Sequence, residues 1–409
     1  MKCRHCAAPL DKVCLDLGSA PPSNAYLSEA ALRAPELWYP LRLLVCERCW
    51  LVQTEDHAGR DALFSDDYAY FSSFSSSWLA HARAYVEAMR SRFALTPASL
   101  VCEVAANDGY LLRYVQAGGI PCYGIEPTAS TARAARSLGL DIVERFFGVE
   151  LARELAAAGR QVDLVAANNV LAHVPDINDF VSGFTLLLKP DGVATFEFPH
   201  LLRLLRENQF DTVYHEHYSY LSLGTVRRVF ESCGLAVFDV EEHPTHGGSL
   251  RVFAQRADTG RRATTDAVAR VLRDEADAGL ATAPGYEGFQ AKVDKLKDDF
   301  MAYLIEARRA GRTVAAYGAA AKGNTLMNYA GVRQDLIAFV VDRNPAKQGK
   351  YMPGSRIPIV AEEHLRATRP DDIVLLPWNL RDELTAQLAY VSEWGARFVT
   401  AVPALKVAP

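Results

Sequence analysis

The segment 210–220 concentrates titratable side chains more densely than a packed core requires. It contains Tyr214, Glu216 and His217, with a further histidine and two further tyrosines beside them. An imidazole titrates near neutral pH, and a phenol or carboxyl group beside it can orient it or polarise an oxygen atom, so the segment suits proton transfer. Metal binding is the alternative, but adjacent residues rarely converge on one ion and the helical spacing His-Glu-x-x-His is absent.

The secondary structure of this segment decides which of its side chains face each other. One helical turn would place Tyr214 and His217 on the same side, whereas an extended strand would pair Tyr214 with Glu216. The sequence leaves both arrangements open.

Two Cys-x-x-Cys pairs indicate a metal site near the N-terminus. Cys3 and Cys6 form the first pair, and Cys46 and Cys49 form the second after a long insert. This spacing is typical of a tetrahedral zinc site with two thiolates from each pair, and four protein ligands would make the zinc structural. Buried thiols without a metal are one alternative. A nucleic-acid-binding zinc ribbon is another, which the acidic residues nearby disfavour.

A ligand-binding turn is predicted within residues 100–112. A short apolar run broken by Glu103 ends in Ala-Ala-Asn-Asp-Gly, and a helical pattern begins at Tyr110. A buried strand, a tight turn and a helix in this order let a ligand approach the backbone. A second short strand ends at Glu126, about 20 residues beyond the turn, where a nucleoside-binding fold places a carboxylate for ribose hydroxyls.

The residues of this turn do not suit a dinucleotide. The fingerprint G-x-G-x-x-G is absent, and Asn107 and Asp108 put acceptors where a pyrophosphate would lie. A cationic or neutral ligand fits better, and S-adenosylmethionine is such a ligand because it carries a sulfonium, an ammonium and a ribose. Some other doubly wound enzyme remains an alternative, because strand-turn-helix starts are common.

Further polar residues follow a buried strand that begins at Val162. Asn168 and His173 lie at its predicted end. Ligands of open α/β sheets bind beyond the carboxyl ends of the strands, so both side chains are expected at the site, although a lone histidine is often purely structural. His246 begins the run HGGSLRV, in which two glycines permit close backbone approach to a ligand; a plain hairpin turn is the alternative.

A second α/β unit is predicted from residue 312 onward. Residues 312–324 have the pattern of a strand, a glycine-containing loop and a helix, and the next strand closes on Asp342. This loop carries Lys322 and no acid, so it would suit phosphates. An NAD(P) site is the alternative, which the missing G-x-G-x-x-G weakens.

Composition excludes several classes of protein. The chain has 409 residues, 50% hydrophobic and 23% charged, which is ordinary usage for a globular chain of two or three domains. The net charge of −5 gives no basic field for nucleic acid or an anionic membrane. No signal-peptide pattern and no apolar run near the ~20 residues of a membrane helix are found, so a cytoplasmic location is expected. Cysteines in that reducing compartment would be thiols or metal ligands.

Five motifs occur in a characteristic order along the chain. They are a four-cysteine knuckle, EVAANDG, YHEHY, HGGSLRV and YGAAAKGNT. Together they resemble the S-adenosylmethionine-dependent C-methyltransferases of deoxysugar biosynthesis, and the resemblance covers nearly the whole chain. That family acts on nucleotide-linked 4-keto sugars, usually dTDP-linked, and commonly methylates C-3. One departure is Ala105-Ala106, where relatives more often have Gly-Ser, which could alter the contact to the donor.

The chemistry that this resemblance implies fits the residues. A 4-keto group acidifies the neighbouring C–H bond, a base removes the proton, and the enolate carbon attacks the S-methyl group. His217 is the expected base, and Tyr214 would lie against the keto or enolate oxygen or share the proton transfer. Glu216 would orient a partner and His173 would line the same pocket.

The resemblance also implies the ligand contacts. Donor contacts are expected from Glu103, Ala105, Asn107, Asp108, Glu126 and Asn168. Contacts to the sugar nucleotide are expected from Asn24, Tyr68, Phe71, His246, Lys322 and Asn324. The expected partner is a dTDP-linked 4-keto deoxysugar, and the protein is expected to be a monomer that binds neither nucleic acid nor membrane.

The expected fold class is α/β. A class I methyltransferase (Rossmann-like) domain would span residues 73–258, after a small zinc-binding, substrate-contacting domain at 1–72. A helical linker would span 259–300, and a second Rossmann-like α/β domain, contacting the sugar nucleotide, would span 301–409. The alternative functions are an NAD(P)-dependent oxidoreductase acting on a sugar nucleotide, a zinc-anchored binding protein without catalysis, and an O-methyltransferase.

Overall fold

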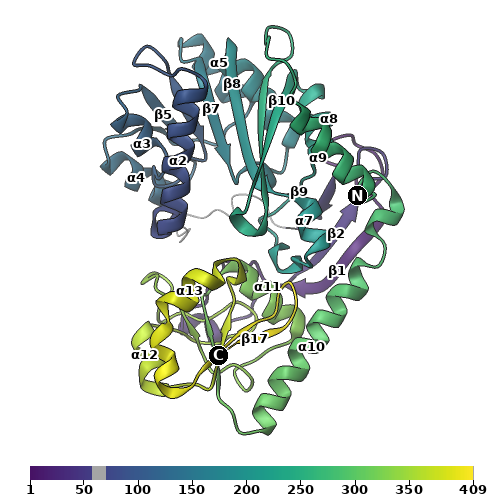
Figure 1. The fold of residues 1–409 in the computed structure, drawn as a ribbon, viewed down its shortest axis with the longest axis vertical. Coiled ribbons are helices and arrows are strands. Elements are labelled where there is room, and N and C mark those ends of the chain that lie inside the picture. The colour runs from purple at the N-terminus through teal and green to yellow at the C-terminus, as the bar shows by residue number, and fades with distance from the viewer. Residues whose placement is uncertain (58–70, 409) are drawn as a thin grey trace.

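The computed structural model describes residues 1–57 and 71–408. Figure 1 shows a central lobe with the largest sheet, a C-terminal lobe below it, and N-terminal strands that run between the two along one side. The helix α10 (Phe289–Arg309) extends along that same side from the N-terminal strands into the C-terminal lobe. No helix within the described residues has the length and apolar character needed to cross a membrane.

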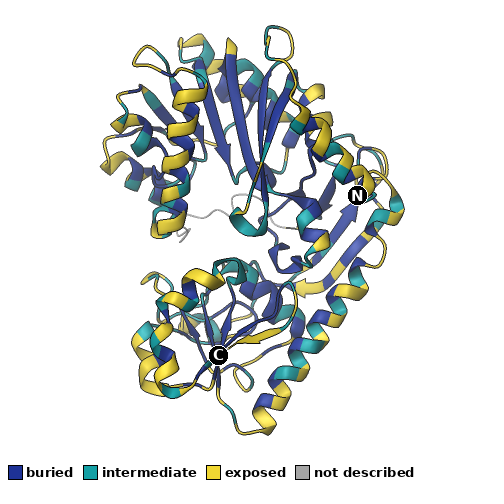
Figure 2. Ribbon diagram, viewed as in Figure 1, coloured by how far each residue is buried: buried dark blue, intermediate teal, exposed yellow. Residues whose placement is uncertain are grey.

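The central sheet has the strand order β10-β11-β8-β7-β4-β5-β6. Its parallel strands are β4 (Val101–Val104), β5 (Cys122–Ile125), β6 (Asp141–Val143), β7 (Val162–Asn168) and β8 (Leu188–Pro199). The hairpin of β10 (Leu235–His243) and β11 (Ser249–Arg256) adds to β8 with β11 antiparallel. Figure 2 shows these strands as buried, as expected for a parallel sheet covered on both faces.

Helices from both sides cover this sheet. They are α2 (Ser76–Arg92), α3 (Leu112–Ala117), α4 (Ala129–Ser137), α5 (Val149–Ala157), α6 (Ile177–Leu187), α8 (Leu223–Ser232) and α9 (Asp266–Asp277). The short helix α7 (Leu201–Arg206) packs instead in the core that the N-terminal strands share with the C-terminal lobe. Apolar residues recur along one face of each longer helix; in α2 these are Ala82, Tyr85 and Met89, which enter the core. The carboxyl ends of β4, β5 and β7 are left open between the lobes.

The N-terminal lobe is a small antiparallel sheet. It is built from β1 (Lys12–Ala20), β2 (Tyr39–Val45) and β3 (Val52–Thr54). Its fourth strand is β9 (Ser219–Tyr220), which comes from the central part of the sequence and pairs with β3. The first residues of the chain therefore share a sheet with the segment that follows His217.

The C-terminal lobe is a second α/β unit with the strand order β14-β13-β12-β15-β16-β17. Its strands are β12 (Val314–Tyr317), β13 (Val340–Val341), β14 (Ile359–Val360), β15 (Asp372–Leu375), β16 (Arg397–Thr400) and β17 (Lys406–Ala408), and only the last is antiparallel. Its helices are α11 (Ala321–Ala330), α12 (Glu362–Thr368) and α13 (Arg381–Gln387).

The region expected to be a linker, residues 259–300, takes part in two cores. Val268 and Val271 of α9 lie in the core of the central lobe. Val293 and Phe300 of α10 lie in the core that β1, β2 and the C-terminal lobe share. The segment thus holds the lobes together by apolar packing on both of them.

Candidate active site

A cavity of about 390 Å³ lies beyond the carboxyl ends of β4, β5 and β7, with walls from all three lobes. This volume falls in the range of small-molecule sites. Of the residues expected from the sequence, its walls include Asn24, Ala105, Asn107, Glu126, Asn168, His173, Tyr214, Glu216, His217, His246 and Lys322. Side chains far apart in the sequence therefore meet in one place.

The turn after β4 is held by Glu126 at the end of β5. One carboxylate oxygen of Glu126 accepts a hydrogen bond from the Asn107 backbone N–H at 2.9 Å, and the other accepts one from Thr128 N–H at 2.9 Å. Ala105 and Asn107 have φ of +59° and +47°, a region that L side chains adopt at a cost. The Ala105 departure from the family pattern thus falls where glycine would be unstrained. Burial raises the pKa of Glu126.

This end of the cavity suits a cationic nucleoside. The side-chain carbonyl oxygen of Asn168, Oδ1, is buried and has no hydrogen-bond partner among the described residues. Another part of the wall is apolar. Phe147, which follows β6, packs edge-on against Phe180 of α6 with ring centroids 5.7 Å apart, and Val174 also lines the cavity. A carboxylate, an orphan acceptor and an apolar wall match the hydroxyl, cationic and aromatic parts of S-adenosylmethionine.

The segment 210–220 is a turn rather than a strand at its chemical centre. After a short 3₁₀ helix, Phe210–Thr212, the His217 N–H donates to the Tyr214 carbonyl at 2.9 Å. The rings of Tyr214 and His217 are therefore on the same side, with centroids 4.0 Å apart. His215 points elsewhere, with Nε2 3.2 Å from the Pro40 carbonyl, so the His-Glu-His run does not converge on a metal. Among the described residues, only the four N-terminal cysteines form such a cluster.

The protonation of His217 is set by its neighbours. Its Nδ1 lies 3.0 Å from the Thr212 carbonyl, which can only accept, so Nδ1 carries the hydrogen and Nε2 carries a lone pair. Burial, followed by the nearby His173, holds the pKa of His217 well below its ordinary value. The imidazole is thus neutral at neutral pH, the form that can take a proton.

His173 packs edge-on against His217, with ring centroids 4.6 Å apart. Its Nδ1 lies 2.8 Å from the Glu216 carbonyl, and burial lowers its pKa to about 4. It therefore carries no charge at neutral pH that would disfavour a protonated His217. Burial likewise lowers the pKa of His246 to about 4.

Glu216 is a buried carboxyl group at the junction of the lobes. Its Oε1 accepts from the Asn24 amide at 3.1 Å, while Oε2 is buried and has no hydrogen-bond partner among the described residues. Burial raises the pKa of Glu216. A group of this kind can accept a hydrogen bond from a ligand hydroxyl.

The C-terminal lobe contributes the cationic side of the cavity. Lys322 lies in the first turn of α11, with Nζ 2.7 Å from Asn379 Oδ1 and 4.9 Å from the centre of the Trp378 ring. Lys347 also lines the cavity and donates to the Ala319 carbonyl at 2.8 Å. Two ammonium groups and a helix N-terminus together suit a phosphate group.

Four of the expected contact residues that the structure describes lie outside the cavity walls. Glu103 is fully buried in the middle of β4, where burial raises its pKa well above the ordinary value. Asp108 accepts from the Ser73 N–H, and Phe71 packs on Phe74. Asn324 is buried and donates to the Ser23 carbonyl at 2.6 Å, which ties α11 to the N-terminal lobe. Tyr68 lies outside the described residues.

The glycine pair after His246 lies where the central lobe and the C-terminal lobe come close together. Gly247 has φ of +88°, and a Cβ built there would lie 2.5 Å from the Trp378 ring. Trp378 belongs to the C-terminal lobe, so the glycine lets the two lobes meet at the cavity edge.

At the first turn of the second α/β unit, the groups that a dinucleotide would bind already form hydrogen bonds within the chain. Asp342, the acid that closes β13, accepts from the Ala319 N–H at 2.8 Å. The Ala319 carbonyl accepts from Tyr26 Oη and from Lys347 Nζ. Residues of this chain therefore occupy the groups that an NAD(P) ribose and pyrophosphate would use.

The four cysteines form a compact cluster. Their sulfur atoms lie within 4.8 Å of one another, and the pairs Cys3–Cys49 and Cys6–Cys46 are 3.5 Å apart. Zinc–sulfur bonds of about 2.3 Å in a tetrahedron require sulfur–sulfur distances of about 3.8 Å, so the cluster fits a zinc ion with little adjustment.

Sequence reasoning missed several residues of the cavity wall, among them Phe147, Lys347 and Trp78. Lys347 follows β13 in a loop with no motif, and Trp78 begins α2 in what was expected to be the boundary between domains. A tryptophan beside a serine N-cap, Ser75, in a segment rich in aromatics was the available signal for Trp78.

The comparisons with known proteins agree with this architecture. Residues 3–64 match the family described as "Putative zinc binding domain", residues 78–240 match "Methyltransferase domain", and residues 244–403 match "C-methyltransferase C-terminal domain". The fold and site are thus those of a class I S-adenosylmethionine-dependent methyltransferase that carries a zinc-binding domain. The chain is also 35% identical over 408 residues to the C-methyltransferase NovU of Streptomyces niveus, covering 99% of this chain and 96% of that protein. The chain belongs to this family of S-adenosylmethionine-dependent C-methyltransferases.

Several solved structures resemble the chain over less than half of its length. Magnesium protoporphyrin IX methyltransferase of Synechocystis PCC 6803 is 18% identical, covers 44% of this chain and 78% of its own, and has a TM-score of 0.32. The PH0226 protein of Pyrococcus horikoshii is 14% identical, covers 46% of this chain and 95% of its own, and has a TM-score of 0.38.

These findings confirm the predicted fold class, the zinc-binding domain and the methyl donor. The predicted alternatives of an NAD(P)-dependent oxidoreductase and of a binding protein without catalysis are wrong, because the family is one of C-methyltransferases. The O-methyltransferase alternative is wrong for the same reason.

Proposed function

We propose that this enzyme methylates a carbon, C-3, of a dTDP-linked 4-keto deoxysugar, for the biosynthesis of a branched-chain deoxysugar. One observation carries the proposal. The neutral imidazole of His217, whose Nε2 carries a lone pair, lines the same cavity as the acceptors Glu126 and Asn168 at one end and the two lysines Lys322 and Lys347 at the other. A base between a methyl donor and a sugar diphosphate is what carbon methylation beside a ketone requires.

The donor end of the cavity would hold S-adenosylmethionine. Glu126 would accept from the ribose hydroxyls, and Asn168 Oδ1 would accept from the ammonium group. When bound, S-adenosylmethionine supplies an electrophilic methyl group on a positively charged sulfur. The apolar wall with Phe147 and Phe180 would take the adenine.

The sugar nucleotide would lie between the N-terminal and C-terminal lobes. Lys322, Lys347 and the first turn of α11 would hold the diphosphate, because charge-assisted bonds to phosphate are strong. Asn24 and Glu216 would bond sugar hydroxyls. His246 would line the sugar side.

His217 would take the proton from C-3. The C–H electron pair moves into the ring to form an enolate, and its oxygen accepts a hydrogen bond from the Tyr214 hydroxyl. The C-3 carbon would then form its bond to the methyl group as the methyl–sulfur bond breaks, and the electron pair of that bond would stay on the sulfur of S-adenosylhomocysteine. The ketone is restored, and His217 returns the proton to solvent. His173, neutral beside His217, would keep the imidazole oriented.

The state of the cysteines supports a cytoplasmic location for the enzyme. All eight cysteines are free thiols, four of them in the zinc cluster, in keeping with the reducing cytoplasm where we place the enzyme. We propose that it acts as a monomer, because the walls of the described cavity come from one chain.

The test is product analysis with purified protein. We expect incubation with S-adenosylmethionine and a dTDP-4-keto-6-deoxyhexose to give a product that is heavier by one methyl group, with NMR placing that group on C-3. A methyl group on C-5 would correct the position only. An O-methyl product, or no product with any dTDP-linked 4-keto sugar while another carbon acid is methylated, would overturn the proposed substrate class.

A further inference from the structure

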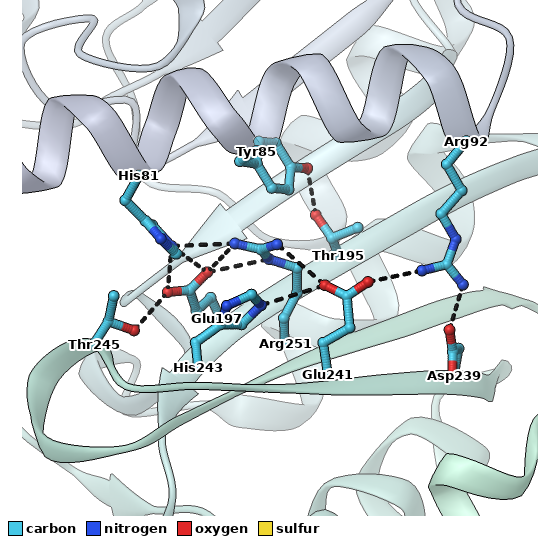
Figure 3. A network of polar contacts seen from close by, with 10 residues as sticks. All are labelled: His81, Tyr85, Arg92, Thr195, Glu197, Asp239, Glu241, His243, Thr245 and Arg251. Atoms are coloured by element: carbon cyan, nitrogen blue, oxygen red, sulfur yellow. Dashed lines mark hydrogen bonds and ion pairs between the residues drawn. The ribbon is translucent and has the colours of Figure 1, made fainter.

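A network of charged and polar side chains, buried at its centre, lies between α2 and the central sheet (Figure 3). It joins α2 to β8 and to the β10–β11 hairpin through ten residues: His81, Tyr85, Arg92, Thr195, Glu197, Asp239, Glu241, His243, Thr245 and Arg251. At its centre Glu197 is fully buried. Its carboxylate accepts hydrogen bonds from Arg251 Nη2 at 2.7 Å and from Arg251 Nε at 3.1 Å. The proposed reaction uses none of these side chains, and Arg251 belongs to the HGGSLRV run.

The network carries an excess of negative charge. Three carboxylates, on Glu197, Glu241 and Asp239, face the two guanidinium groups of Arg251 and Arg92, which leaves a fixed charge of −1 when both histidines are neutral. Burial would raise the pKa of Glu197, but its bonds to His81 and Arg251 outweigh burial and hold that pKa at about 2. The network therefore adds a negative contribution to the potential at the nearby cavity wall, where Lys322 of the C-terminal lobe adds a positive one.

His81 connects this centre to the cavity. Its Nε2 lies 2.8 Å and 2.9 Å from the two carboxylate oxygens of Glu197, which fixes the plane of the imidazole. The indole ring of Trp78 stacks on that plane, with centroids 5.0 Å apart and 21° between the rings. Glu197 and Trp78 are thus linked through one intermediate ring.

Trp78 is also confined from two other sides. Its ring lies 5.8 Å from that of Tyr110, in the turn after β4, and 5.1 Å from that of His246 in the β10–β11 turn. Thr245, beside His246, donates to Glu197 at 3.1 Å. The tryptophan is mostly buried, and its accessible part lines the cavity.

The sheet order places Trp78 on the charged side of the donor. Glu126 follows β5. Trp78 contacts the turns after β4 and between β10 and β11, and these strands lie away from β6, the strand that leads to Phe147 of the apolar wall. With the ribose at Glu126 and the adenine at the apolar wall, the sulfonium and amino groups extend over β4 and β7, towards Trp78. This step rests on the donor placement under the proposed function.

We propose that Trp78 presents its ring face to the positive sulfonium of the donor, and that Glu197 and Arg251, acting through His81, hold the ring there. Trp78 is then a residue for donor selectivity, and His81 is a positioning residue. Cation–π attraction acts on the charged donor and is lost when methyl transfer leaves a neutral thioether. The site therefore binds the substrate form more tightly than the product form and releases the product.

The test measures the affinities of S-adenosylmethionine and S-adenosylhomocysteine by calorimetry on the full-length zinc-loaded protein, without any sugar nucleotide. We expect Trp78→Leu to reduce the preference for the charged ligand about tenfold, the effect of a desolvated cation–π contact. Trp78→Phe, which keeps an aromatic face, should retain most of the preference. His81→Gln should reduce the preference about threefold, because the indole is no longer held by a stacked ring.

Two outcomes separate this inference from the donor placement. Glu126→Gln should weaken both ligands by the same factor, because both carry the ribose. If it does so while Trp78→Leu weakens both ligands equally, the role of Trp78 is purely structural and the inference is overturned. If Glu126→Gln leaves both affinities unchanged, the donor placement is wrong and the inference fails with it.

Discussion

The phenol ring of Tyr214 lies against the imidazole of His217, with 4.0 Å between ring centroids and 34° between the planes. The hydrogen bond between the His217 N–H and the Tyr214 carbonyl fixes this pairing in a turn. A hydroxyl and a nitrogen lone pair therefore face one region of the cavity, as an enolisation requires.

Removing the Tyr214 hydroxyl should slow the chemical step. In Tyr214→Phe the ring can still pack on His217, so the loss is confined to the donor aimed at the enolate oxygen. We expect kcat for methyl transfer to fall about 10²-fold or more, with the KM for S-adenosylmethionine nearly unchanged. A kcat close to that of the unmodified enzyme would remove Tyr214 from the mechanism.

Replacing Lys322 should weaken binding of the sugar nucleotide. A charge-assisted bond to phosphate contributes about 1.5–3 kcal/mol, so Lys322→Met should raise the KM for the dTDP-sugar by about tenfold to a hundredfold. The KM for S-adenosylmethionine should not change. Lys295, which is 75% exposed on α10, provides the matched control, and Lys295→Met should leave both KM values unaltered. Equal KM values in the two variants would argue against a diphosphate at α11.

Asp211 should make the stability of the protein depend on pH. Burial raises the pKa of this carboxyl group from 3.8 to about 6, with Lys322 and the Trp378 N–H opposing. Between these values the folded state binds more protons than the unfolded state, so the free energy of unfolding falls as the pH rises from about 4 to 6, by roughly 3 kcal/mol. Asp211→Asn, which can still accept from Trp378, should lack this decrease.

Urea unfolding of both proteins across that pH range provides the measurement. Other buried acids titrate in both proteins, so the informative quantity is the difference between the two stability curves. We expect this difference to grow in favour of Asp211→Asn up to about pH 6 and then to level off. A difference that is constant with pH would place the pKa of Asp211 at its ordinary value.

Loss of the zinc ion should disturb the turn that carries His217 as well as the N-terminal lobe. The second cysteine pair leads directly into β3, where Thr54 Oγ1 donates to the His217 carbonyl at 2.9 Å. We expect metal analysis to find one zinc per chain, and Cys46→Ser to reduce both the zinc content and kcat. Cys233→Ser, outside the cluster, should change neither. Full activity in a zinc-free Cys46→Ser protein would show that the knuckle does not support His217.

Local patterns in the sequence predicted the elements that local interactions determine. The apolar run before Ala105 and the acid at Glu126 mark two adjacent parallel strands, and both lie where the pattern placed them. The two cysteine pairs define the metal cluster because each knuckle is a local structure. Such features need only a short stretch of chain to be recognised.

Contacts between distant segments could not be predicted. The pairing of β3 with β9 joins residues more than 160 positions apart. The two strands have only three and two residues, too few for a periodic pattern that would predict the pairing. Glu103, the one acid in the apolar run before the turn, was expected at the ligand, but a strand covered on both faces leaves its middle residues buried. Lys347 reaches the cavity only through the placement of the C-terminal lobe.

The most direct test of the account is the exchange of the C-3 hydrogen of a dTDP-linked 4-keto sugar with deuterated water. The enzyme, bound to S-adenosylhomocysteine so that no methyl group can be transferred, should introduce one deuterium at C-3, seen by mass spectrometry and NMR. His217→Asn should abolish this exchange while still binding both ligands. Exchange at an undiminished rate in His217→Asn would contradict the claim that this imidazole removes the proton.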